Sequence, residues 1–127
     1  MTHYSQRCKE SRIDYSFKVA IPEKVPISDY DICIIVGNLL ENAVEASQKI
    51  NGERKILLTI KIHNEQLVLR VENNYETSVQ SDDNINKESN GLGLRSVNLV
   101  MDRYGGKLLI KQEGNIFTAS VLMDLVG

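Results

Sequence analysis

The sequence has little of the residues that build covalent or metal-held frameworks: two cysteines, two prolines and no tryptophan among 127 residues. Cys8 and Cys33 are too few and too far apart for a disulfide framework or a cysteine-based zinc site. Both thiols are most simply reduced, so we expect a cytoplasmic location. Cys33 falls in the apolar part of a predicted helix and is expected to be buried.

An excess of basic residues and long hydrophobic runs are also missing. The net charge is −2 and the pI about 5.7, which argues against a nucleic-acid-binding module, since such a module normally shows a basic stripe. No apolar run approaches the roughly 20 residues of a membrane span, so we expect this chain not to cross a membrane. The length fits one domain. We expect residues 1–12 to be a leader or linker remnant and residues 13–127 to be the domain.

Hydrophobic periodicity predicts an alternation of strands and helices. The expected helices are 29–48 and 94–104, and the expected strands are 13–21 (odd-numbered residues inward), 55–63, 67–72, 107–112 and 116–123. This order predicts an α/β fold, more closely an α+β two-layer sandwich whose mixed, mostly antiparallel sheet is covered on one face by helices. Residues 73–90 are too long and polar for an ordinary connection, so they form either a functional loop or a disordered one.

Two amides stand out in the first helix, within the stretch Asn38–Ser47. Ile32, Val36 and Leu40 fall on its apolar arc, and Asn38 and Asn42 lie four residues apart. We therefore expect both amides to project from one side, roughly opposite that arc. A solvated helix surface produces the same pattern, so the spacing alone leaves both interpretations open.

A glycine pair opens the second helix, within the stretch Asn90–Val97. Backbone N–H groups of Gly93 and Leu94, together with the positive end of the helix dipole, can capture an anion. Glycines also serve as hinges into helices, which is the alternative interpretation.

Together, NLLENAVEAS at 38–47 and NGLGLRSVNLVMDRYGG at 90–106 resemble the GHKL-type ATP-binding domain of gyrase, Hsp90, histidine kinases and MutL, which has the Bergerat-type fold. The pattern looks most like the C-terminal catalytic domain of AgrC-like sensor histidine kinases, over about residues 13–124. The resemblance implies a two-component kinase that binds ATP with Mg²⁺. It would donate the γ-phosphate to a histidine on a separate dimerisation and phosphoacceptor hairpin. A response regulator would act downstream, and the parent kinase would be membrane-anchored.

The resemblance also implies the binding residues. Asn42 corresponds to the magnesium ligand, and Asn38 would reach the waters of the metal or a phosphate. Lys87 and Arg95 are candidate phosphate counter-charges that can equally be solvated. The full set expected to bind nucleotide is Asn38, Asn42, Asn73, Lys87, Gly91, Leu92, Gly93, Leu94 and Arg95.

The sequence departs from the family pattern at several positions: the first glycine motif is missing after Val71, Ile116 replaces a threonine, and three more departures bear on the chemistry. Asn73 replaces the adenine-binding aspartate, and its neutral oxygen accepts a weaker hydrogen bond. Asn38 replaces the glutamate that activates water in gyrase-type and Hsp90-type ATPases, which argues against hydrolysis. Glu45 stands where many kinases carry a basic residue. An anti-sigma-type serine kinase and a nucleotide-free scaffold of the same fold remain alternative interpretations.

Overall fold

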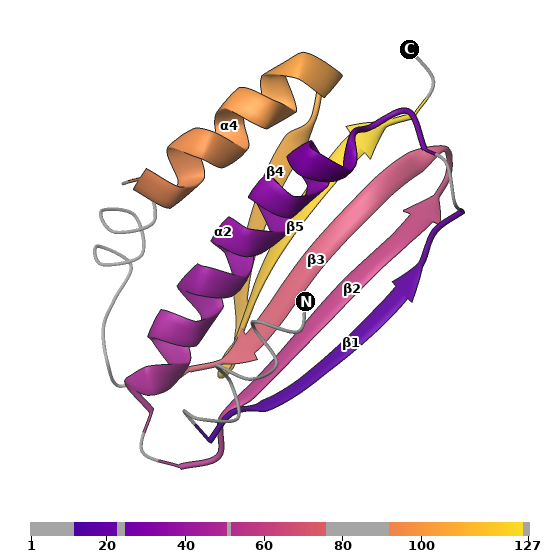
Figure 1. Cartoon of the computed structure of the whole chain (residues 1–127). Coiled ribbons are helices and arrows are strands. Elements are labelled where there is room, and N and C mark those ends of the chain that lie inside the picture. Colours follow the sequence, from indigo (N-terminus) through magenta and orange to yellow (C-terminus); the bar gives the residue numbers. More distant parts are fainter. Residues whose placement is uncertain (1–11, 23–24, 51, 76–91, 126–127) are drawn as a thin grey trace.

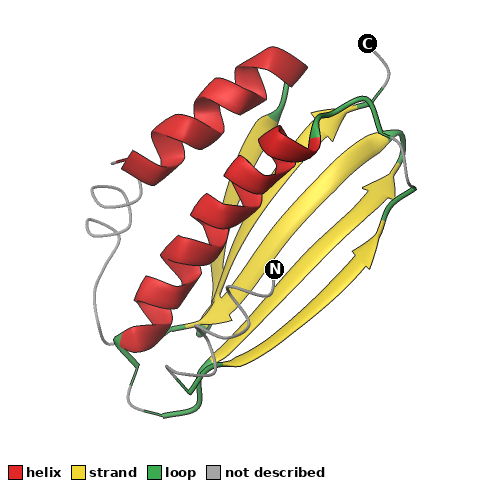
Figure 2. Cartoon of the chain, in the orientation of Figure 1, coloured by secondary structure: helices red, strands yellow, loops and turns green. Residues whose placement is uncertain are grey.

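The computed structural model describes residues 12–22, 25–50, 52–75 and 92–125, which form two layers. Strands of this part of the chain form one sheet in the order β1-β2-β3-β5-β4, and two helices lie on one face of it (Figures 1 and 2). Only β1 and β2 pair in parallel. The predicted fold, with its mixed, mostly antiparallel sheet, is confirmed. The elements are β1 (Asp14–Ala20), α2 (Asp29–Gln48), β2 (Lys55–His63), β3 (Gln66–Asn74), α4 (Leu92–Tyr104), β4 (Lys107–Glu113) and β5 (Ile116–Asp124).

Most element boundaries agree with the predicted ones to within one residue, and two differ by two residues. α4 begins at Leu92 rather than Leu94. β3 continues past Glu72 to Asn74, because the Asn74 side chain fastens this end of the strand. Its Oδ1 accepts from the backbone N–H of Lys55 at 2.8 Å, and its Nδ2 donates to the carbonyl of Glu53 at 2.6 Å. Within the described ranges, neither helix has the length and apolar character needed to span a membrane. The predicted loop after Tyr75 lies outside the described residues.

The core lies between the two helices and the middle strands of the sheet, as one row of aligned residues shows. From edge to edge, Phe17, Leu58, Val71, Ala119 and Ile110 sit side by side on the helix-facing side. Their exposed fractions are 53, 0, 2, 6 and 43%. Burial is therefore complete under the helices and falls away at both edge strands.

Two predictions of burial were wrong, one for β1 and one for Cys33. Odd-numbered residues of β1 do share the face of buried β2 residues, but Phe17 and Val19 are exposed because α2 packs over β2 and β3. Cys33 is exposed as well. It follows buried Ile32 by one residue, and a helix turns by about 100° per residue, so Cys33 points away from the buried stripe.

Side chains outside the regular pattern fix both ends of α2. Ser28 caps the N-terminus by accepting from the N–H of Asp31 at 3.1 Å. At the other end Arg54 donates to the carbonyls of Gln48 at 3.2 Å and Ile50 at 2.9 Å. A guanidinium placed there satisfies carbonyls that have no partner within the helix and complements the negative end of its dipole.

The C-terminus of α4 is stopped by two glycines that act differently. Gly105 has φ +63°, which glycine adopts without strain. The N–H of Gly106 donates to the carbonyl of Met101 at 2.9 Å, as in a Schellman motif. A Cβ on Gly106 would lie 2.9 Å from the Met123 Cγ and 3.1 Å from the Leu122 carbonyl oxygen. Gly106 is therefore required by close packing of α4 on β5.

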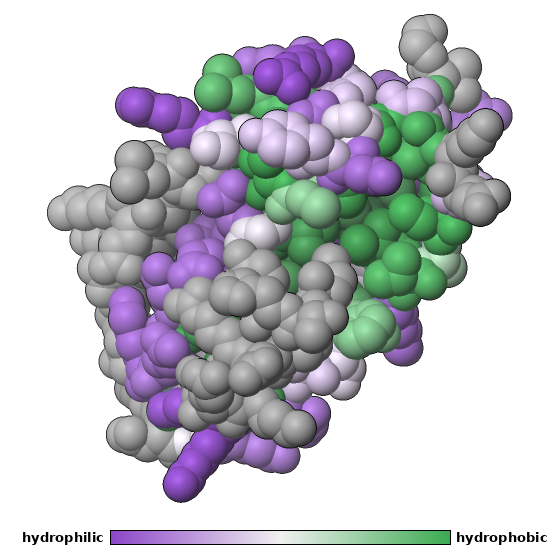
Figure 3. All heavy atoms as spheres, in the orientation of Figure 1, coloured by the Kyte–Doolittle hydropathy of each residue, from purple (hydrophilic) through white to green (hydrophobic). Residues whose placement is uncertain are grey.

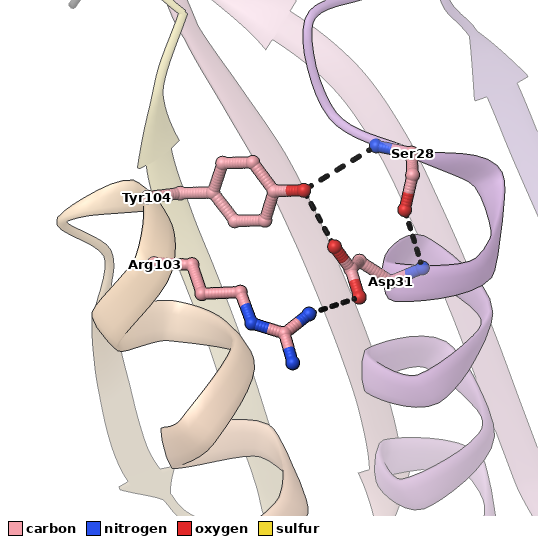
Figure 4. A network of polar contacts seen from close by, with 4 residues as sticks. All are labelled: Ser28, Asp31, Arg103 and Tyr104. Carbon is pink, nitrogen blue, oxygen red and sulfur yellow. Dashed lines mark hydrogen bonds and ion pairs between the residues drawn. The ribbon is translucent and has the colours of Figure 1, made fainter.

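A buried carboxylate joins the beginning of α2 to the end of α4 (Figure 4). Asp31 is 4% exposed, and its carboxylate accepts from the Tyr104 hydroxyl at 2.5 Å and from Arg103 Nη1 at 3.0 Å. The Tyr104 hydrogen bond, together with Ser28 and Arg103, lowers the pKa of Asp31, and burial opposes this effect only in part. These contacts hold the two helices antiparallel and side by side.

Asp31→Asn is expected to lower the midpoint of thermal unfolding at neutral pH, because the amide loses the ion pair with Arg103. The folded-state pKa of Asp31 lies below its unfolded value of about 3.9. The charge therefore stabilises the fold above that value, and this contribution is lost as the pH falls through the folded-state pKa. Calorimetry should show the difference between wild type and variant shrinking in acid. A difference that stays constant with pH would mean that Asp31 acts by packing alone.

Ser47 offers a second stability test, because its side chain is fully buried and Oγ has no hydrogen-bond partner among the described residues. Ser47→Ala removes this unsatisfied group and should stabilise the protein by about 1 kcal/mol. Ser120→Ala is the matched control, since Arg70 Nε donates to Ser120 Oγ at 3.2 Å. That substitution should destabilise by about 0.5–1.5 kcal/mol. Urea unfolding measures both, and a destabilised Ser47→Ala would contradict the assignment.

Candidate functional site

A small hollow, partly open to solvent, lies between α2 and the strands β3, β5 and β4. Apolar walls with a few polar groups are typical of small-molecule sites. Two asparagine amides are the polar exceptions in an otherwise apolar lining. The lining residues are Leu39, Asn42, Ala43, Val71, Asn73, Ile110, Phe117 and Ala119.

Asn73 supplies the most enclosed polar group of the hollow. It lies near the end of β3, is 3% exposed and aligns with Ile56 on one side and Phe117 on the other. Its Nδ2 donates to the carbonyl of Asn74 at 3.1 Å. This hydrogen bond uses one N–H of the amide and orients the side chain, and Oδ1 is an acceptor that a bound molecule can use.

Asn42 lines the same hollow, beside Leu39 and Ala43 of α2. The prediction that both amides project opposite the apolar arc is therefore wrong. The buried surface of α2 is wider than the predicted arc, and it includes Asp31 and Ile35. At about 100° per residue, Asn42 falls between these two positions, at the rim of the buried surface.

Asn38 is half-buried and is not among the residues that line the hollow. Its Nδ2 donates to the carbonyl of Ile34, one turn earlier, at 2.7 Å. One N–H of the amide is thus used within α2, and the oxygen is available as an acceptor for a ligand. The structure therefore separates the two predicted amides into one that lines the hollow and one that lies a turn away.

The N-terminal turn of α4 lies level with Asn42. Because Tyr104 contacts Asp31 and the helices are antiparallel, twelve residues back along α4 correspond to about twelve residues forward along α2. Leu92 is thereby placed roughly opposite Ala43. Leu92, Gly93 and Leu94 form the first turn, whose N–H groups have no partner within the helix. Arg95 follows and is exposed, while Lys87 and Gly91 lie outside the described residues.

Sequence patterns missed most of the apolar lining. Val71, Ala119 and Ile110 are neighbours in one row across the sheet, and only the strand register brings them together. Phe117 also has a ring neighbour, Tyr75, at 6.4 Å between ring centroids and nearly perpendicular. The Tyr75 N–H donates to the carbonyl of Asn115 at 2.8 Å, which fixes Tyr75 beside the final hairpin. Tyr75, directly after β3, and Phe117, near the start of β5, were the sequence features that could have indicated this side of the hollow.

Solved structures of histidine kinases have a similar fold. The catalytic domain of histidine kinase ThkA matches with a TM-score of 0.78 and 20% identity over 98% of this chain and 86% of that one. Acinetobacter baumannii histidine kinase AdeS matches with a TM-score of 0.75 and 15% identity, over 99% of this chain and 61% of that one. The histidine kinase domain of the blue-light activated histidine kinase of Erythrobacter litoralis matches with a TM-score of 0.79 and 17% identity, over 96% of this chain and 57% of that one. At these identities the likeness concerns the fold.

Comparison with curated protein sequences finds no match. A family model does match, over residues 27–124, and it is described as the GHKL domain (HATPase_c_5). The match includes both helices, the strands β2 to β5 and every residue that lines the hollow. The chain therefore belongs to the GHKL domain family.

Proposed function

We propose that this chain is the ATP- and magnesium-binding catalytic domain of an AgrC-like sensor histidine kinase. It donates the γ-phosphate to a histidine on a separate dimerisation and phosphoacceptor hairpin. Membership of the GHKL family supports nucleotide binding. The observation that carries the proposal is the hollow, which combines apolar walls, two amides and the nearby first turn of α4.

The residues that line the hollow suit contact with a purine base. Val71 and Ala119 form its apolar floor on the sheet, and Leu39 and Phe117 form walls against which a flat ring can pack. The Oδ1 of Asn73 accepts a hydrogen bond from the 6-amino group of adenine. The acceptor is neutral, so this bond is weaker than one to a carboxylate.

The first turn of α4 suits the phosphates. The N–H groups of Gly93 and Leu94 point toward the N-terminal end of the helix, where the positive end of the dipole also lies. Gly93 has no side chain that would obstruct approach to these N–H groups. A nucleotide whose base fills the hollow extends its phosphates past Asn42 toward this turn.

Asn42 is the residue that would hold magnesium. Magnesium prefers oxygen ligands and retains several waters, so one amide oxygen and the phosphate oxygens suffice. Consistent with a metal that arrives with nucleotide, no group of three or more His, Cys, Asp or Glu side chains in the described ranges could hold a metal alone. When bound, magnesium neutralises charge on the phosphate oxygens. Asn38 adds an oxygen one turn away, and neither amide can act as a base.

Phosphoryl transfer then depends on positioning by this chain and on an acceptor from elsewhere. His63 is at the far end of β2 from Ile56, the neighbour of Asn73, and seven residues of strand span about 23 Å. It cannot receive a phosphate held at α4. We propose a cytoplasmic location, a membrane-anchored parent kinase and a downstream response regulator. The fold match to ThkA, crystallised with the response regulator protein TrrA, supports the last of these.

Asn42→Ala should weaken Mg-ATP binding by about tenfold, because it removes the only protein oxygen proposed to reach the metal. Titration calorimetry with magnesium and with a chelator should confine the loss to the magnesium condition. Asn98→Ala, which removes an exposed amide on α4, is the matched control and should bind as wild type. Equal losses in both conditions would refute the metal assignment, and absence of any ATP binding by the wild type would indicate a nucleotide-free scaffold.

Replacing ATP with ITP should weaken binding to the wild type by about tenfold. The two nucleotides differ at the base, where ITP presents a carbonyl oxygen to the acceptor Oδ1 of Asn73, so a hydrogen bond becomes a repulsion. Asn73→Leu should bind both nucleotides weakly and with similar affinity. If the variant kept the wild-type preference for ATP, Asn73 would not be the group that recognises the base.

A further inference from the structure

The outer edge of β4 combines an apolar centre with a backbone that no described strand covers. Among the described strands β4 has only β5 as a neighbour, and no hydrogen bond between described residues reaches its outer edge. Leu109 and Ile110, in the middle of the strand, are 52 and 43% exposed. An edge strand with exposed apolar residues is a template for pairing with another strand.

The final hairpin shows which residues of β4 face outward. Glu113 pairs with Ile116 across a two-residue turn that begins at Gly114, where φ is +62°. Residues that flank such a turn are joined by a backbone hydrogen bond, and successive residues of a strand turn their N–H and C=O groups to opposite edges. The odd-numbered residues of β4 therefore face β5. The residues that direct their backbone groups to the outer edge are Leu108, Ile110 and Gln112.

We propose that the partner at this edge is a second copy of this chain, whose β4 pairs antiparallel with the first about a two-fold axis at Ile110. The two copies of Ile110 then form a hydrogen-bonded pair, and Leu108 of each copy lies opposite Gln112 of the other. The axis is perpendicular to the sheet, so the helices of both copies stay on the same side. The inference does not depend on nucleotide binding. Because Ile110 also lines the hollow, its tests are made without nucleotide.

Charge complementarity selects a second copy and this register. Lys107 and Glu113 lie three residues on either side of Ile110, so the lysine of each copy is opposite the glutamate of the other. Opposite-charge cross-strand pairs are stabilising, and like charges directly opposite are destabilising. A register centred on Leu109 would place Lys107 opposite Lys111, and one centred on Lys111 would bring two copies of that lysine together. Edge lysines usually discourage pairing, and here they exclude the wrong registers.

The existing contacts of these side chains are compatible with the pairing. Lys107 is exposed and has no ion pair among the described residues. Glu113 is paired with Lys111 of its own strand at 3.4 Å, and both side chains are at least 70% exposed. Such an exposed pair contributes little to stability, and a carboxylate has two oxygens, so Glu113 can accept from both lysines. Leu109 lies opposite Lys111, whose aliphatic stem can pack on it.

The opposite edge of the sheet does not support the same inference, although it is also apolar. Figure 3 shows hydrophobic side chains gathered on the side of the sheet where β1 lies. Tyr15 of that strand is, however, already engaged in an interaction. We therefore place the second copy at β4.

The size of this contact determines its expected strength. Two paired strands of seven residues bury less surface than the roughly 1,600 Å² of a standard interface. The charge pairs are exposed, so salt screens them. We therefore expect a weak, concentration-dependent dimer whose stability falls with added salt.

Disulfide cross-linking tests the register, in a Cys8→Ser, Cys33→Ser background. Leu109 would lie opposite Lys111 of the other copy in a non-hydrogen-bonded pair with Cα atoms about 4.5 Å apart, which a disulfide can span. Mild oxidation of a mixture of the Leu109→Cys and Lys111→Cys variants should therefore give a covalent dimer. Each variant alone is the control, because two copies of the same residue would lie about 7–8 Å apart on the diagonal. Cross-linking no better in the mixture than in either variant alone would overturn the register.

A charge exchange tests the same contact without cross-linking. By sedimentation equilibrium, Glu113→Lys should raise the dimer dissociation constant by about tenfold, because two attractive pairs become repulsive. The double variant Glu113→Lys, Lys107→Glu should restore it. Glu65→Lys, at an exposed position in the turn between β2 and β3, is the matched control, because it makes the same change in net charge and should leave dimerisation unchanged.

Unchanged thermal unfolding of these variants would confirm that the fold is intact. A wild type that remains monomeric at millimolar concentration would overturn the proposal. So would a double variant that fails to recover, or an equal loss of dimer in Glu65→Lys.

Discussion

Pairing of β3 with a strand on each side is the constraint on which the rest of this structure depends. β3 pairs along its full length with β5 and over residues 66–73 with β2, and its apolar residues Leu67, Leu69 and Val71 are at most 2% exposed. A slip of one residue would turn all of them to the opposite face. The same pairing aligns Val71 with Ala119 and Asn73 with Phe117, so the floor of the hollow follows from the register that buries the core.

The end of β3 carries two identical side chains whose amides are used differently. Asn74 uses both ends of its amide on the backbone of Glu53 and Lys55, which ties the strand to the connection after α2. Asn73 uses only its nitrogen, on the carbonyl of Asn74. Adjacent strand residues point to opposite faces, so one amide faces the helices and the other faces away. The Asn73 oxygen at the hollow is thus held in place by a single hydrogen bond to the neighbouring residue.

Much of the fold could be predicted from sequence, because the alternation in Lys55–His63 and the apolar spacing of α2 are local patterns. Predictions failed where a property depends on what lies across the sheet or between helices. Phe17 has the pattern of an inward residue, but only the layer arrangement shows that no helix covers it. Asn42 was predicted on the wrong side of the helix, because Asp31 widens the buried surface through its contacts with α4. The lining of the hollow required strand register, which no single segment encodes.

Arg54 has a consequence for how this chain can tolerate insertions. Its guanidinium holds the C-terminal carbonyls of α2, while its own carbonyl accepts from the first residue of β1. Hairpin tips usually accept extra residues without disturbing the elements they join. The connection between α2 and β2 has no such freedom, because a longer connection would separate Arg54 from the helix end that it caps. Insertions there would rotate or shift α2 on the sheet, and Asn42 would move relative to Asn73.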